Sequence, residues 1–258
     1  MKVIILAAGQ GTRLRPMTDN MPKCMVEVNS KSIIKRQIEV IKGCGIEEKD
    51  IIIVCGYKYD VLKRHLSDTD IKFIYNKNYE NTNMVYSFMC AENELKDDII
   101  VSYGDIIYEE KVLKKLLEAK NSISIVLDDG WYNYWSQRSE DPLNDAETLK
   151  LDYEDCIVEI GQKTSKIEDI QSQYIGLMRF KDDGIKSVVE LCEEAKRRSH
   201  EGERLWRTDR RYDKMYMTDM LQGLIDESKK LYSIRINRGW FEIDNADDLA
   251  VAELECRS

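Results

Sequence analysis

Short runs of β-branched residues alternate with longer amphipathic segments through the first half of the chain. Isoleucine, valine and leucine recur at helical spacing over residues 33–41 and 112–117, which predicts two helices that each have one apolar face. This alternation is typical of strand–helix units wound into a mostly parallel sheet, so we predict an α/β fold with helices flanking the sheet. The apolar runs predict five buried strands, at residues 3–6, 51–55, 71–75, 99–102 and 123–127.

The second half of the chain breaks this rhythm. Residues 131–155 are polar, rich in aromatic side chains and contain Pro142, which predicts an inserted segment over one end of the sheet. Strands are predicted again at 156–160, 174–180, 231–236 and 240–243, and helices at 184–199, 216–226 and from about 245. Because the chain has neither an internal repeat nor a low-complexity linker, we predict one domain over 1–258, with halves 1–127 and 128–258.

The charge balance narrows the choice of partners. The chain carries 39 Lys and Arg residues against 48 Asp and Glu residues, a net charge of −9. Nucleic acids are bound mainly by basic surfaces, so a small molecule fits better than nucleic acid. No apolar run approaches 18 residues, so we expect no membrane partner. The seven cysteines form no CxxC pair, which predicts reduced thiols and a cytoplasmic location.

The first predicted strand runs directly into a glycine-rich segment, LAAGQGTRLRP at residues 6–16. A glycine-rich turn after a strand lets backbone N–H groups approach a phosphate closely. The dinucleotide fingerprint does not fit because Leu14 stands at its third glycine position, and no Gly-Lys-Ser/Thr follows for a P-loop. Arg13 and Lys23 supply two cations instead, which suits a triphosphate that loses pyrophosphate.

This segment, continued by Pro22 and Lys23, resembles the motif LAAGxGTRLxPxT…PK of the nucleoside-diphosphate-sugar pyrophosphorylase-like nucleotidyltransferases. Gly104-Asp105 is similar to the family's strand-end Gly-Asp, and Asp244 in WFEID (240–244) looks like its second metal-binding aspartate. The resemblance implies a Rossmann-like sheet of the GT-A type and a Mg²⁺ ion held by the two aspartates. Aspartates at two strand ends can meet at one edge of the sheet.

Within that family the chain most resembles the small cytidylyltransferases that activate phosphocholine, phosphoglutamine and related amino compounds. The resemblance implies transfer of CMP from CTP to a small phosphorylated or phosphonate amino compound, with release of pyrophosphate, for surface polysaccharide or phospholipid-like decoration. EIGQK at 159–163 loosely resembles the family's Glu-x-Lys-Pro region, without the proline and with a longer spacing. The closer resemblance is carried by NTNMVYS (81–87), DPLNDAET (141–148), QYIGL (173–177) and YMTD (216–219).

The inserted segment has the composition of a site for a cation. Residues 128–155 contain nine acidic and two basic residues, together with two tryptophans and three tyrosines. Aromatic faces and carboxylates bind ammonium groups, and each cation–π contact contributes roughly 0.5–2 kcal/mol. We therefore predict that this segment binds the amino end of the acceptor. The alternative is an acidic surface hairpin with aromatic side chains folded beneath it.

Together these patterns assign a role to each candidate site residue. Arg13, Lys23 and Lys163 are predicted to be catalytic, and Asp105 and Asp244 to bind Mg²⁺. Nucleotide binding is predicted for Leu6, Ala7, Ala8, Gly9, Gly11, Thr12, Asn83, Ser87 and Gly104. Acceptor binding is predicted for Trp131, Trp135, Asp145, Glu147, Glu159 and Tyr174.

Other functions stay open alongside this one. A sugar-1-phosphate nucleotidyltransferase would use the same glycine-rich loop, whereas a glycosyltransferase is disfavoured because Ile106 and Ile107 follow Asp105 in place of a second metal carboxylate. A catalytically inactive nucleotide-binding regulator is disfavoured because all four predicted cations and carboxylates of the nucleotide site are present. The basic residues 196–211 are interpreted as a solvated helix end and loop, with a phosphate lid or a subunit contact, as in a homodimer, as alternatives.

Overall fold

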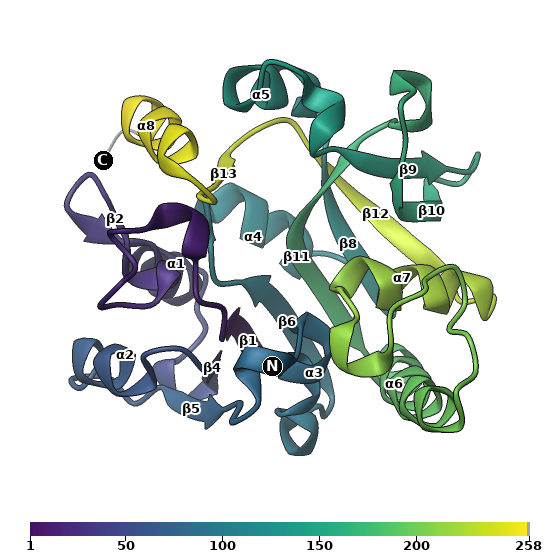
Figure 1. Cartoon of the computed structure of the whole chain (residues 1–258), viewed down its shortest axis with the longest axis horizontal. Helices are drawn as coiled ribbons and strands as arrows, with labels where there is room; N and C mark the ends of the chain where they lie inside the picture. The colour runs from purple at the N-terminus through teal and green to yellow at the C-terminus, as the bar shows by residue number, and fades with distance from the viewer. Residues whose placement is uncertain (257–258) are drawn as a thin grey trace.

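The computed structural model describes residues 1–256 and contains a central sheet of nine strands (Figure 1). These strands are β1 (Lys2–Ala7), β4 (Ile51–Cys55), β5 (Lys72–Tyr75), β6 (Asp98–Tyr103), β8 (Ile123–Asp128), β9 (Glu147–Leu151), β10 (Cys156–Lys163), β11 (Gln173–Lys181) and β12 (Leu231–Ile236). Their order in the sheet is β5-β4-β1-β6-β11-β8-β12-β10-β9. Seven strands run in one direction, and β10 and β11 run against them. The predicted α/β fold with a mostly parallel sheet is confirmed.

Helices cover both faces of the sheet. One face packs against α1 (Ile33–Gly43), α2 (Tyr59–His65), α4 (Glu110–Leu117) and α5 (Trp131–Arg138). The other packs against α3 (Met84–Met89), α6 (Asp183–Glu201) and α7 (Met217–Asp226). Because successive side chains of a strand point to opposite faces, Ile4 and Leu6 of β1 enter the second core while Val3 and Ile5 enter the first.

The first and last parts of the chain meet through a third, smaller core. Two short pairs of strands lie here: β2 (Glu27–Val28) with β3 (Lys31–Ser32), and β7 (Ile106–Tyr108) with β13 (Trp240–Glu242). The C-terminal helix α8 (Ala246–Glu255) lies beside β2 (Figure 1). This core holds the loop after β1 against the segment after β13, and its buried members are Leu14, Val26, Val28, Ile33, Ile107, Ile243 and Ala252.

The segment predicted as an insertion over one end of the sheet is regular for much of its length. It contains α5, which packs into the core beneath the sheet, and β9, which forms one edge of the sheet. The sheet takes strands from both predicted halves of the chain. Within residues 1–256, no helix combines the length and the apolar character needed to span a bilayer.

Candidate active site

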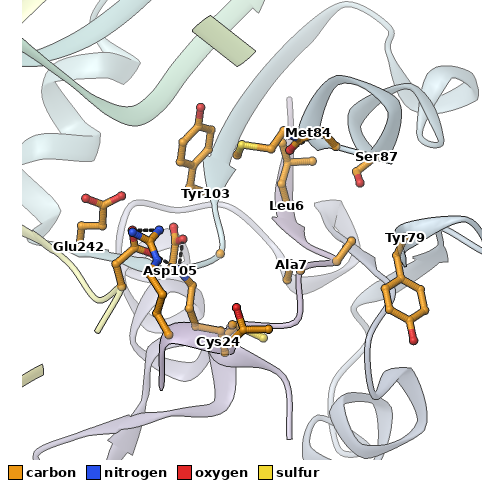
Figure 2. Close-up of a pocket in the computed structure, with 18 of the residues that line it drawn as sticks. Leu6, Ala7, Cys24, Tyr79, Met84, Ser87, Tyr103, Asp105 and Glu242 are labelled. Carbon is orange, nitrogen blue, oxygen red and sulfur yellow. Dashed lines mark hydrogen bonds and ion pairs between the residues drawn. The ribbon is translucent and has the colours of Figure 1, made fainter. Parts of the chain in front are cut away.

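A cavity of about 400 Å³ opens where β1 and β6 end. This is the expected place for a ligand, because open α/β sheets bind ligands beyond the carboxyl ends of their strands. Figure 2 shows Asp105 and Glu242 at one end of the cavity, Tyr79 and Ser87 at the other, and Leu6 and Ala7 between them. The cavity therefore has one strongly charged end and one end lined by hydroxyl groups.

The structure brings most of the predicted nucleotide site to this cavity. All nine residues predicted for nucleotide binding and both predicted metal ligands line it, and so do two of the three predicted catalytic residues. Their placement agrees with the predictions, and their roles stay predictions. These residues are Leu6, Ala7, Ala8, Gly9, Gly11, Thr12, Arg13, Lys23, Asn83, Ser87, Gly104, Asp105 and Asp244.

Two glycines in the lining are required by their positions. Gly11 has a φ of +62°, and a Cβ built there would lie 2.7 Å from the Cβ of Lys23. Gly104 donates its N–H to the Leu6 carbonyl at 2.9 Å, and a Cβ there would lie 2.7 Å from that oxygen. A larger residue at either position would push apart the segments that form the cavity.

The charged end is a network of two cations and two aspartates. The Lys23 ammonium lies 2.5 Å from a carboxylate oxygen of Asp105 and also bonds Asp244. Arg13 donates to the other oxygen of Asp244. Burial disfavours the Lys23 charge, but Asp105 and Asp244 outweigh it and raise the pKa of Lys23. Burial likewise opposes ionisation of Asp244, yet Lys23 and Arg13 lower its pKa overall.

Glu242 joins this network, although the sequence analysis gave it no role. One oxygen of its carboxylate lies within 4.8 Å of an oxygen of Asp105 and of Asp244, and those two oxygens are also within 4.8 Å of each other. Burial raises the pKa of Glu242 to about 8 against the opposing effect of Arg138. The sequence did contain a signal for Glu242. Residues 242 and 244 are two positions apart, and in an extended segment such residues point to the same side.

These three carboxylates fit a hard divalent cation. Mg²⁺ takes oxygen ligands and is bound in proteins through a few carboxylates together with substrate phosphates. Among the described residues the Oδ1 atom of Asp105 has no hydrogen-bond partner, although it is buried. An unpaired buried carboxylate oxygen beside two further carboxylates is suited to an ion that supplies the missing charge.

Asp105 and Asp244 are far apart in the sequence, and backbone pairing between two short strands brings them together. β7, which follows Asp105, pairs antiparallel with β13, which precedes Asp244. The N–H of Ile243 donates to the Asp105 carbonyl at 2.9 Å. The buried Gln37 amide donates to the carbonyls of Tyr103 and Ile106, which fixes the turn that carries Asp105.

The other end of the cavity is organised by a buried amide that the sequence analysis missed. Asn76 donates to the hydroxyls of Thr82 and Ser87, both at 3.0 Å. Asn83 accepts from the N–H of Met84 and so caps α3. Tyr79 completes this end, and no motif in the sequence pointed to it. Hydroxyl and amide groups held in place like this suit a nucleobase or a ribose.

The prediction that Trp131 and Trp135 wall the acceptor site is wrong. Each side chain is 4% exposed and lies in the core on α5. Their rings pack edge to face on each other, with centroids 6.2 Å apart, and Trp135 also contacts Tyr134 and Trp240. These aromatic side chains recur at helical spacing and form the buried face of α5. They therefore match the alternative stated above, in which aromatic side chains fold beneath an acidic surface segment.

Lys163, predicted to be catalytic, and two of the residues predicted for the acceptor lie at the surface of the β9–β10 region. Lys163 is exposed at the end of β10. Glu159 forms ion pairs with Lys150 at 3.3 Å and Arg207 at 3.6 Å. Asp145 is exposed just before β9. None of them lines the cavity in the described part of the chain, so their contact with an acceptor stays a prediction.

Glu147 and Tyr174 lie closer to the cavity. Tyr174 packs edge to face on Tyr103, which lines it, with ring centroids 5.6 Å apart. Burial raises the pKa of Tyr103, and the neighbouring Tyr174, Glu147 and Asp105 raise it further. Burial also raises the pKa of Glu147, reinforced by Asp219 and Asp145 and opposed by Arg210.

The basic residues 196–211 are mostly paired with carboxylates. Arg197 contacts Glu194 and Glu201, Arg210 contacts the buried Asp219 at 3.1 Å, and Arg207 contacts Asp226 at 3.0 Å. These pairs agree with the interpretation of a solvated helix end and loop.

Comparison with known proteins points to the same chemistry. A model of the MobA-like NTP transferase domain matches residues 3–143. A Campylobacter jejuni protein named CTP:phosphoglutamine cytidylyltransferase is 41% identical over 258 residues, covering 97% of this chain and 98% of that protein. The choline-phosphate cytidylyltransferase of Streptococcus pneumoniae is 41% identical over 112 residues, covering 42% of this chain and 47% of that protein.

The fold has a close counterpart among solved structures. The structure of the CTP:phosphocholine cytidylyltransferase from Streptococcus pneumoniae superposes with a TM-score of 0.71 and 23% sequence identity, covering 99% of each chain. This likeness confirms the GT-A-like nucleotidyltransferase fold.

The charge network makes a prediction about stability and pH. In Lys23→Met, the carboxylates of Asp105 and Asp244 lose their shared cation, so we expect the free energy of unfolding to fall by roughly 3 kcal/mol at pH 7. The folded pKa of Asp244 is depressed, so the pair stabilises the fold above the unfolded pKa of Asp and this contribution is lost as pH falls through the folded pKa. The deficit should therefore shrink below about pH 4.

Thermal and urea unfolding of the wild type and Lys23→Met between pH 3.5 and 7.5 would measure this. Lys150→Met is the matched control, because Lys150 pairs with Glu159 and Asp169 on the surface and should cost at most about 1 kcal/mol. A Lys23→Met deficit that is the same at every pH would contradict the electrostatic explanation.

Proposed function

Since the chain belongs to the MobA-like NTP transferase family, we propose that it transfers CMP from CTP to a small phosphorylated amino compound and releases pyrophosphate. The observation that carries this proposal is the network of Arg13, Lys23, Asp105 and Asp244 beside the glycine-rich loop. The choice of CTP and of an acceptor like phosphoglutamine is supported by the relative that matches almost the whole chain. Its product would serve as an activated group for surface polysaccharide. The seven free thiols support a cytoplasmic location.

Catalysis in this proposal is positioning and charge neutralisation. An oxygen of the acceptor phosphate attacks the α-phosphorus of CTP in line, and the bond to the pyrophosphate oxygen breaks. The acceptor phosphate is largely ionised at neutral pH, so the attack needs no general base. The backbone of residues 6–12 approaches the triphosphate, and Arg13 and Lys23 neutralise the charge that develops on the leaving pyrophosphate.

Asp105, Glu242 and Asp244 are proposed to hold Mg²⁺, for which their oxygens and the unpaired Asp105 Oδ1 are suited. A bound Mg²⁺ supplies charge stabilisation at the phosphates. Lys23 holds two of these carboxylates in place when they carry no ion.

The acceptor is proposed to bind beyond Tyr103, between the cavity and the start of β9. Glu147 and Lys163 stand opposite each other in the β9–β10 pairing. Residues directly opposite on antiparallel strands lie on the same face of a sheet, so both can reach one small molecule. We propose that Lys163 contacts the acceptor phosphate, while Glu147, with Asp145 beside it, contacts the ammonium or amide nitrogen at the other end.

The proposal is tested by pyrophosphate release from each of the four NTPs with a panel of acceptors. The panel contains phosphoglutamine, phosphocholine, phosphoethanolamine, aminoethylphosphonate and hexose 1-phosphates. We expect the highest kcat/KM with CTP and one of the amino compounds. A preference for a hexose 1-phosphate would establish the sugar nucleotidyltransferase instead, and CTP binding without turnover on any acceptor would favour a regulator.

Metal dependence follows from the three carboxylates. We expect excess EDTA to abolish pyrophosphate release and added Mg²⁺ to restore it. Asp105→Asn and Asp244→Asn should each lower kcat by about 10²–10³, because each removes a group held against the reacting phosphates. Asp152→Asn is the control, since Asp152 belongs to an acidic group in the β9–β10 turn outside the cavity. Full activity in EDTA would contradict the mechanism.

A substitution at Glu147 is expected to affect acceptor binding and not nucleotide binding. In Glu147→Gln the acceptor's nitrogen loses a charged partner, so kcat/KM for a cationic acceptor should fall about 10-fold while KM for CTP stays within about 2-fold. Asp145→Asn should act in the same direction more weakly, because Asp145 is exposed. Glu154→Gln, which alters a surface pair with Lys230, is the matched control. A loss confined to CTP would refute this placement of the acceptor.

A further inference from the structure

Helix α5 contacts the end of β13, which carries Glu242 and is followed two residues later by Asp244. The hydroxyl of Tyr134 accepts a hydrogen bond from the N–H of Glu242 at 2.9 Å and donates to the Glu242 carbonyl at 3.3 Å. One turn further along, Arg138 reaches the same segment with its guanidinium group. The helix that the sequence analysis assigned to the acceptor therefore adjoins the charged end of the cavity instead.

Arg138 is a buried cation held between two carboxylates. Its side chain is 5% exposed, and one of its terminal nitrogens lies 2.8 Å from a carboxylate oxygen of Glu242. Its Nε and Nη2 atoms donate to the two oxygens of Asp248, at 2.7 and 3.2 Å. The guanidinium also lies over the rings of Tyr134 and Trp135, about 5 Å from each centroid, so aromatic walls fix its plane.

Asp248 links Arg138 to the backbone of Asp244. It is the third residue of α8, and its side chain is completely buried. Its Oδ2 atom accepts from the backbone N–H groups of Asp244 at 2.9 Å and Asn245 at 3.2 Å. One guanidinium thus contacts Glu242 directly and holds the backbone of Asp244 through Asp248.

We propose that Arg138 is a positioning residue that fixes Glu242 and Asp244 in the arrangement that binds the divalent metal; this inference rests on the metal site of the proposed function. Three carboxylates within 4.8 Å repel one another, so an unsupported Glu242 would turn away from Asp105 and Asp244. Arg138 pairs with Glu242, whereas Lys23 and Arg13 pair with Asp105 and Asp244. Groups that orient metal ligands in this way typically affect metal affinity or activity 10- to 100-fold.

This geometry requires the several N–H donors of a guanidinium group as well as its charge. A lysine at position 138 would keep the positive charge, but a single ammonium cannot reproduce the two parallel bonds to Asp248 together with the bond to Glu242. A role through charge alone predicts that lysine substitutes fully for Arg138. It also predicts that removing the charge, which leaves the site more negative, strengthens metal binding.

The test is the affinity of the purified protein for Mn²⁺, measured as loss of the free Mn²⁺ signal in electron paramagnetic resonance without nucleotide or acceptor. We expect Arg138→Lys and Arg138→Met each to weaken Mn²⁺ binding at least 10-fold. The control is Arg179→Lys, because Arg179 is an equally buried arginine, 7% exposed, with two bonds to Asp98 at the opposite end of β6. It should lower the melting temperature and leave Mn²⁺ affinity within about 2-fold.

Each outcome decides the proposal. Wild-type affinity in Arg138→Lys, tighter binding in Arg138→Met, an equal loss in Arg179→Lys or no Mn²⁺ binding by the wild type would each overturn it. If the Arg138 variants do not fold, Asp248→Asn, which keeps the side chain's size and weakens its bond to Arg138, should show the same loss. A protein that is inactive with CTP but shows this Mn²⁺ pattern would refute the proposed reaction and leave the inference standing.

Discussion

Burial of the central strands on both faces is the constraint on which the rest of the structure depends. Val3, Ile4 and Ile5 of β1 are completely buried, and so are Ile99, Ile100 and Val101 of β6. Strands of this kind have no face left for polar side chains, so charged groups can stand only where the strands end. The glycine-rich loop and Asp105 lie at those ends, and the cavity forms there.

The charges at this edge of the sheet come from several parts of the chain, and cations from one part neutralise carboxylates from others. Asp105 and Asp244 are far apart in sequence, and the pairing of β7 with β13 places them on either side of Lys23. The third core packs Leu14 near Arg13 against Ile243 beside Asp244, so apolar burial sets the distance between cations and carboxylates. The cations and carboxylates of the site are therefore held in place by the packing of the fold itself.

The aromatic cluster on α5 explains why the composition of residues 128–155 led to a wrong prediction for Trp131 and Trp135. Acidic residues and tryptophans are neighbours in the sequence of 128–155, and a cation-binding cage would have the same composition. In the fold, Trp131, Tyr134 and Trp135 of α5 face the core, whereas Tyr132 is exposed. The acidic residues of the segment are exposed or half-buried, except Asp128, which is buried and bonds Arg238 and Trp240. Their contribution to the site is indirect, because the packed rings hold Tyr134 and Arg138 against Glu242.

The sequence by itself determined the class of fold, the strand that leads into the glycine-rich loop and most of the residues that line the cavity. It could do so because strand burial and glycine-rich turns are local properties, set by residues adjacent in the chain. Only the tertiary structure decided that Glu242 joins Asp105 and Asp244, that Asn76 organises the far end of the cavity, and that Trp131 and Trp135 are core residues. These facts depend on which segments pack together, and the burial and charge of a side chain are set by neighbours that are distant in the sequence.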